Sequence, residues 1–175
     1  QIRVSSLQIT TEIVDLAYLI GSSVCHQLPT RTLSIGSVPL PLCARCTGLH
    51  LGLWVGAAYA FFYKRSSLFN PGLSNVAARI FVIGSFLLLA ADVFTHQWGW
   101  QSGSNEIRLL TGLIAGFAIG LFIVSPLPAA TDNQNTFKVI GIRDIVIGLL
   151  LVLLLWGLIP NLPAESLLVV VLFEM

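Results

Sequence analysis

The residues best suited to chemistry are cysteines at two places in the chain. Cys43 and Cys46 form a CxxC pair, whose sulfurs can reach one metal ion or join as a disulfide. Cys25 directly precedes His26, and His50 lies one helical turn beyond Cys46. Cysteine thiolates with one histidine form the ligand set of a tetrahedral zinc site, and thiolates also suit iron or copper. We therefore expect these cysteines to bind Zn or another thiophilic metal, with His26 or His50 as the fourth ligand.

A second group of polar residues lies further along the chain. Asp92 and His96 are one helical turn apart at the end of an apolar segment, and Arg108 opens the next one. Ionisable groups at membrane depth are costly unless they are paired, so we expect Asp92 to pair with Arg108. The polar residues expected to support the cysteines are Arg31, Arg45, Asp92, Thr95, His96, Ser104, Asn105 and Arg108.

The cysteines also fit two other functions. A CxxC at a helix start has a lowered thiol pKa, which suits a thiol–disulfide redox protein with Cys25 as the resolving thiol. Cysteines are also often inert, buried hydrophobes, which would suit an accessory subunit of a larger membrane complex. His50 in addition offers an imidazole for haem or a chlorin. The sequence has no nucleotide loop, nucleophile elbow or HExxH, so it identifies no reaction and leaves open whether the chain is an enzyme.

The composition requires that most of the surface faces lipid. The 175-residue chain is 55% hydrophobic and only 10% charged, whereas a soluble domain carries about 25% charged residues. A net charge of +1 without a basic tract argues against nucleic acid, which needs several cations against its phosphates. We expect a single integral membrane domain over residues 1–175, with the lipid bilayer of the cell membrane as its main partner.

Apolar segments long enough to cross about 30 Å of hydrocarbon determine the fold class. They cover about residues 46–63, 76–94, 109–125 and 144–160. These segments predict an all-α, polytopic bundle of transmembrane helices. Residues 9–24 have helical apolar spacing but contain Glu12 and Asp15, and residues 163–175 are too short to span. We expect an interfacial or additional helix at each of these ends.

Alternate crossings of the membrane bring the polar residues to one face. Residues 25–48, which form the cysteine loop and a helix mouth, then share this face with Asp92 and Arg108. The opposite face receives more cations, namely Lys64, Arg65, Arg79, Lys138 and Arg143. Because loops rich in lysine and arginine stay in the cytoplasm, the cysteine site is predicted on the extracytoplasmic face.

Small residues repeat at every fourth position in two of the predicted helices. One series is Gly48, Gly52, Gly56 and Ala60, and the other is Gly112, Gly116 and Gly120. This spacing lets helix backbones approach closely, which drives packing where lipid offers no hydrophobic force. We predict that the faces 48–60 and 112–120 make helix contacts, and each is a candidate partner for the other.

Two segments of the chain resemble the signature of a known family. Residues 25–31 (CHQLPTR) and 42–48 (LCARCTG) are similar to a family of small predicted membrane proteins of bacteria and archaea, a domain of unknown function. The likeness covers roughly residues 24–120, and it continues through Asp92, Thr95, Ser104, Asn105, Arg108, Thr111 and Gly112. The resemblance implies an aromatic residue at the position of His50 and glutamine at that of His96. It supports the site and implies no reaction.

Overall fold

The structure is a computed structural model that describes residues 12, 14–35, 38–63, 73–98, 104–124 and 140–162. Several predictions concern positions outside these residues. They are the segment 163–175, the cations Lys64, Arg65 and Lys138, and the side chain of His96.

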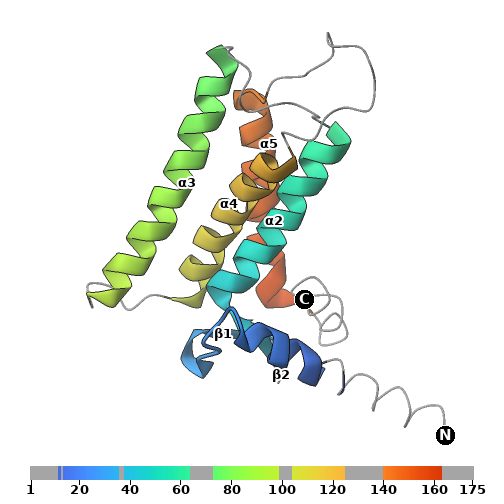
Figure 1. The fold of residues 1–175 in the computed structure, drawn as a ribbon, viewed down its shortest axis with the longest axis vertical. Helices are drawn as coiled ribbons and strands as arrows, with labels where there is room; N and C mark the ends of the chain where they lie inside the picture. Colours follow the sequence, from blue (N-terminus) through green and yellow to red (C-terminus); the bar gives the residue numbers. More distant parts are fainter. Residues whose placement is uncertain are drawn as a thin grey trace, which may run out of the picture.

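Four long helices form the body of the molecule (Figure 1). They are α2 (Ala44–Tyr63), α3 (Leu73–Gln97), α4 (Asn105–Val124) and α5 (Ile142–Leu158). Each is a long apolar run without an internal proline, so nothing interrupts its hydrogen bonds. Pro160 lies beyond α5, in the short 3-10 helix η3 (Ile159–Asn161). These bounds agree closely with the four apolar segments predicted from the sequence.

Three of these helices are long and apolar enough to cross a membrane. The qualifying stretches are Val76–Thr95, Asn105–Ile123 and Ile142–Asn161. They confirm three of the predicted spans by length and composition. Helix α2 also has 20 residues, but it is not among the stretches that qualify. That α2 is a fourth span stays a prediction.

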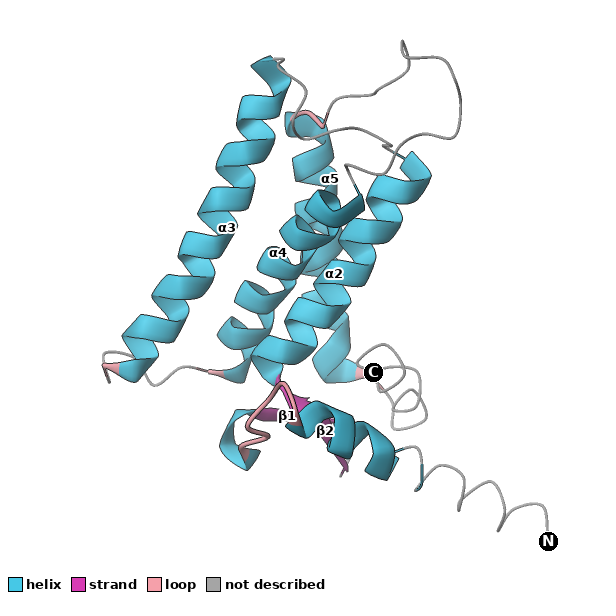
Figure 2. Ribbon diagram, viewed as in Figure 1, coloured by secondary structure: helices cyan, strands magenta, loops and turns pink. Residues whose placement is uncertain are grey.

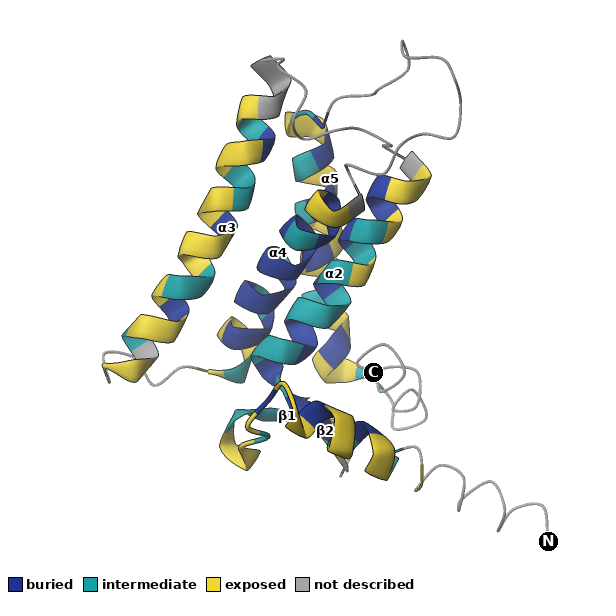
Figure 3. Cartoon of the chain, viewed as in Figure 1, coloured by how far each residue is buried: buried dark blue, intermediate teal, exposed yellow. Residues whose placement is uncertain are grey.

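Helix α4 lies at the centre of the bundle (Figure 3). Of its membrane-length stretch 61% is buried, against 11% for α3 and 22% for α5. The ring of Phe117, fully buried on α4, packs against Tyr59 of α2 and Phe81 of α3. Gly148 of α5 makes room for the same ring, since an added Cβ would collide with it. The outer faces of α3 and α5 expose large apolar side chains, as expected where lipid is the solvent.

Helices α2 and α4 run side by side in the same direction, and their glycines make this possible. A Cβ added at Gly52 would collide with the carbonyl oxygen of Leu113, and one added at Gly116 with that of Leu49. Similar backbone collisions would occur at Gly48, Gly56, Gly112 and Gly120. The predicted contact between the two glycine faces is therefore confirmed.

A small hairpin covers the end of the bundle where α2 begins (Figure 2). Strand β1 (Thr32–Ile35) follows the 3-10 helix η1 (Pro29–Arg31) and pairs antiparallel with β2 (Val38–Cys43). The sequence predicted an all-α protein with a proline-punctuated loop here, so the hairpin corrects that prediction. Leu40 and Leu42 are each only 1% exposed. Because residues two apart in a strand face the same side, an extended chain lets both leucines be buried together. Prolines are tolerated because both strands of a two-stranded sheet are edge strands.

Residues 14–22 form a short helix that lies across this same end (Figure 1). It buries Ala17 and Gly21 and exposes Leu16 and Leu19. A Cβ at Gly21 would lie only 3.0 Å from the Pro41 carbonyl oxygen, so the helix packs tightly on β2. A helix was expected within residues 9–24, and the described part confirms it. That this helix is interfacial stays a prediction.

Candidate functional site at the cysteine cluster

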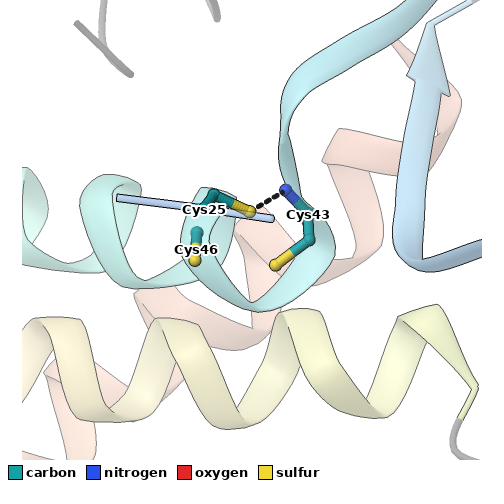
Figure 4. A group of neighbouring side chains, drawn as sticks. All are labelled: Cys25, Cys43 and Cys46. Atoms are coloured by element: carbon teal, nitrogen blue, oxygen red, sulfur yellow. Dashed lines mark hydrogen bonds between the residues drawn. The ribbon is translucent and has the colours of Figure 1, made fainter. Parts of the chain in front are cut away.

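Cys25, Cys43 and Cys46 come together at the hairpin end of the bundle (Figure 4). Their sulfur atoms all lie within 4.8 Å of one another, and the three thiols are free. Sulfurs around one tetrahedral zinc ion, each about 2.3 Å from it, are roughly 3.8 Å apart. Small side-chain rotations would therefore close this group on an ion. The prediction that the three cysteines meet is confirmed.

The CxxC pair crosses a strand-to-helix junction. Cys43 ends β2, and Cys46 lies in the first turn of α2. Thr32 is the partner of Cys43 across the hairpin, and the side chain of Asn105 donates a hydrogen bond to the Thr32 carbonyl at 3.3 Å. The position of Cys43 thus depends on both the hairpin register and the start of α4.

Cys25 reaches the cluster from the end of the helix at residues 14–22. Its N–H donates to the Gly21 carbonyl at 2.8 Å, which closes the last turn of that helix. Its sulfur accepts a hydrogen bond from the Cys43 N–H at 3.3 Å, drawn as a dashed line in Figure 4. Cys25 is 7% exposed, so this sulfur is held in the interior.

Gln27 fastens the Cys25 loop to its surroundings. Its side-chain amide donates to the Tyr18 carbonyl at 2.7 Å and to the Pro41 carbonyl at 2.9 Å. Its backbone is left-handed, with a φ of 50°. One side chain thus joins the short helix, the Cys25 loop and β2. Gln27 is not among the residues predicted from the sequence, where its place in the CHQ segment is the one signal that points to it.

The thiol of Cys43 is unusually acidic. Its pKa falls to about 5, chiefly because the Cys46 thiol donates a hydrogen bond to it, while burial acts in the opposite direction. The Cys46 N–H, the Cys25 thiol and the Arg45 N–H also lower this pKa. The thiolate is the form that binds metals and attacks disulfides. The hydrogen bonds that the cluster supplies therefore favour the thiolate form of Cys43.

A cavity of about 370 Å³ opens beside the cysteines. Its walls include His26 and the arginines Arg31, Arg45 and Arg108. A volume in the range of about 300–1,000 Å³ is typical of small-molecule sites. Four of the predicted polar residues thus surround the cysteines in one concave space.

Asp92 pairs with Arg45 rather than with Arg108, which was its predicted partner. Arg45 donates from Nε to the Asp92 carboxylate at 2.9 Å and forms an ion pair with it through Nη2. The Thr111 hydroxyl lies 3.2 Å from the same oxygen, so Asp92 connects α3 with α2 and α4. Arg108 is buried and donates to the Asn105 side chain at 2.9 Å.

Among the described residues, Thr95, Ser104 and His50 do not line the cavity. The Thr95 hydroxyl donates to a carbonyl one turn earlier in α3, and Ser104 caps α4 by accepting from a backbone N–H. His50 is half-buried in α2, and its Nδ1 has no hydrogen-bond partner within the described part of the chain. The sulfur group found among the described residues includes neither His26 nor His50. Which histidine is the fourth ligand stays a prediction.

Two archaeal proteins are similar to this chain. One is an uncharacterised protein of Methanocaldococcus jannaschii, 32% identical over 107 residues, which are 61% of this chain and 65% of that protein. The chain therefore spans a little less than two thirds of this relative. The other is an uncharacterised protein of Methanothermobacter thermautotrophicus, 34% identical over 102 residues, which are 58% of this chain and 84% of that protein. No solved structure matches the chain.

A family model also matches, over residues 25–122 and thus more than half of the chain. Its description is "Predicted membrane protein (DUF2085)". The match begins at Cys25 and ends near the end of α4, so it includes the cysteine cluster, the Arg45–Asp92 pair and the glycine contact. This agrees with the resemblance seen in residues 25–31 and 42–48. The chain belongs to the DUF2085 family of predicted membrane proteins.

Proposed function

We propose that Cys25, Cys43 and Cys46 bind a thiophilic metal ion, best fitted by zinc, at one face of the membrane. The observation that carries the proposal is the approach of their sulfur atoms to within 4.8 Å of one another. The backbone N–H groups and side chains that hold these sulfurs come from separate elements, so the approach depends on the whole hairpin end of the fold.

The charges around the cluster also favour a bound metal. Three thiolates and one divalent cation carry a combined charge of about −1. Arg31, Arg45 and Arg108 line the adjoining cavity, so their positive charges stabilise thiolates in a partly buried place. Asp92 and Thr111 support Arg45, and Asn105 supports Arg108.

His26 is our choice for the fourth ligand. It is exposed beside Cys25 and lines the cavity, so its ring can turn toward the sulfurs without moving a helix. His50 lies on α2, a turn beyond Cys46, and is not among the described residues that line the cavity. One axial histidine is enough to hold haem, so haem or chlorin binding through His50 stays a prediction.

We further propose that the chain is one membrane domain with four spans and that the cysteine site faces outward. Helix α2 is about 30 Å long at 1.5 Å per residue and lies against the candidate span α4, so it crosses the same layer. Arg79 and Arg143 lie toward the end of the bundle away from the cysteines. Lys64, Arg65 and Lys138 are outside the described residues, in the segments that follow α2 and precede α5 in the sequence. The excess of cations predicts that this end is cytoplasmic.

The metal is tested on the full chain, purified in detergent without chelator. Metal content is measured by mass spectrometry, and free thiols are counted before and after adding a chelator. We expect about one zinc ion per chain, and thiols that react only after chelation. Cys25→Ser, Cys43→Ser and Cys46→Ser should each lose most of the metal, and His26→Ala should bind it at least tenfold more weakly.

His50→Ala is the matched control, because it removes the same side chain outside the cavity. The chelator measurement on the unaltered chain keeps the test valid where a cysteine variant does not fold. A metal-free chain with a reducible disulfide would overturn the proposal in favour of thiol–disulfide redox chemistry. Metal-free, inert thiols with co-purifying subunits would overturn it in favour of an accessory role in a larger membrane complex.

A further inference from the structure

The cavity beside the cysteines is lined partly by cationic side chains and partly by exposed apolar side chains. Arg31 and Arg108 lie on the wall, and no acidic side chain among the described residues lines the cavity. The charge of Arg45 is balanced by Asp92, which lies behind it. Val24 and Leu28 also line the cavity and are 63% and 42% exposed, although both are large and apolar.

Arg31 is free to bind a ligand. Its guanidinium has no hydrogen-bond or ion-pair partner among the residues that the structure describes. The backbone is nevertheless fixed, since Arg31 ends η1 and its N–H donates to the Leu28 carbonyl at 2.9 Å. A fixed backbone with an unengaged guanidinium suits oxyanion recognition, because the planar group can donate two parallel hydrogen bonds to phosphate.

The size of the cavity and its surroundings indicate an amphiphile. A space of about 370 Å³ can hold a polar headgroup but not the acyl chains of a lipid. Val24 follows the short helix in the chain, and Leu16, Leu19 and Ile20 of that helix are also large, apolar and exposed. A soluble anion would gain nothing from this apolar surface, whereas a lipid would cover it.

We propose that the cavity binds the phosphate headgroup of a membrane phospholipid. Arg31 and Arg108 would face the phosphate, and Val24 and Leu28 would contact the glycerol and the first acyl carbons. The location fits, because α3 ends and α4 begins at this face, where lipid phosphates lie. This binding does not require the metal, so the two proposals can fail separately.

The test titrates the purified full chain in detergent with phosphatidylglycerol and counts bound lipid by native mass spectrometry. We expect saturable binding that Arg31→Gln weakens at least tenfold and that Arg31→Lys weakens less, since lysine keeps the charge but loses the paired donors. Arg143→Gln is the matched control, because it removes the same charge from an exposed arginine at the other end of the bundle. It should bind as the unaltered chain does.

Two further titrations identify the lipid. Diacylglycerol, which lacks the phosphate, should not bind, and inorganic phosphate should compete weakly. The proposal is overturned if Arg31→Gln binds as tightly as Arg143→Gln, if diacylglycerol binds equally well, or if inorganic phosphate binds and the lipid does not. Metal content is measured on the same samples. If a variant loses lipid binding but keeps its full metal content, the result concerns the lipid proposal and leaves the metal proposal unchanged.

Discussion

At the scale of single residues, Gln27 shows how the cysteine loop is held in a strained shape. A left-handed backbone costs a residue with a Cβ about 1–2 kcal/mol. Gln27 adopts it with a φ of 50°, and the two hydrogen bonds of its side chain oppose this cost. As a result, Cys25 is buried and held in one position, so we regard Gln27 as a positioning residue for the metal site.

Substitution of Gln27 separates the effect of its side-chain hydrogen bonds from the effect of its left-handed backbone. Gln27→Ala loses both hydrogen bonds and keeps the strain, so it should lower the free energy of unfolding by about 1–3 kcal/mol and weaken metal binding. Gln27→Gly should be about 1 kcal/mol less harmful, because glycine adopts the left-handed conformation freely. Thermal unfolding and zinc titration measure both. Gln97→Ala is the control, since Gln97 lines the same cavity, and an equal effect there would contradict this role.

At the same scale, the sequence predicted that Asp92 has a cationic partner but not which arginine it is. Burial of a carboxylate at a helix end predicted a cationic partner, which is what the structure shows. Arg31, Arg45 and Arg108 were all expected at this face, and no spacing distinguishes them. Arg45 is the partner because α2 and α3 both pack on α4, which brings the start of α2 and the end of α3 within reach of the long Arg45 side chain.

At the scale of elements, the two glycine series hold α2 against α4. Each glycine in them faces a backbone carbonyl of the other helix closely enough that a methyl group has no place. Close backbone contact maximises dispersion forces, the main attraction available within lipid. Because Cys46 and Arg45 stand on α2, and Arg108 and Asn105 on α4, this contact also sets the geometry of the site.

Alanine substitution should therefore act oppositely at two glycines of the bundle. Gly116→Ala should destabilise the protein by about 1–3 kcal/mol, because the Leu49 backbone cannot yield. Gly84→Ala on α3 has nothing within 4 Å of the new methyl group, so it should be neutral or stabilise by up to about 1 kcal/mol. Unfolding of both variants in detergent checks this. Equal stabilities would argue against close packing of α2 on α4.

At the scale of the whole molecule, the four helices alternate in direction, and the hairpin closes one end (Figure 1). The cysteine cluster, the cavity and the Arg45–Asp92 pair all lie at that end. Among the described residues, the buried polar side chains away from that end are Ser85 and Asp144. Asp144 accepts from the Tyr59 hydroxyl at 2.8 Å and from the Gly141 N–H at 2.9 Å. The candidate functional groups of the described residues thus lie at one end of the bundle.

The proposed orientation is tested by single cysteines at the two ends. Ser34→Cys lies on the exposed hairpin and Arg143→Cys at the exposed start of α5. In intact cells, a membrane-impermeant maleimide should label the first variant, and the second only after permeabilisation, with the unaltered chain as baseline. The reverse pattern would invert the orientation, and labelling of both in intact cells would contradict an odd number of crossings between them.

The long apolar helices, the glycine contacts and the meeting of the cysteines could all be predicted from the sequence. They follow from local properties, since the transfer of a segment into lipid depends on its own composition and length, and successive crossings then place alternate connections on the same side. The hairpin at residues 32–43, the partner of Asp92 and the role of Gln27 became visible in the folded structure alone. Each of these depends on which groups distant segments bring within about 3 Å of one another, a distance that no local pattern encodes.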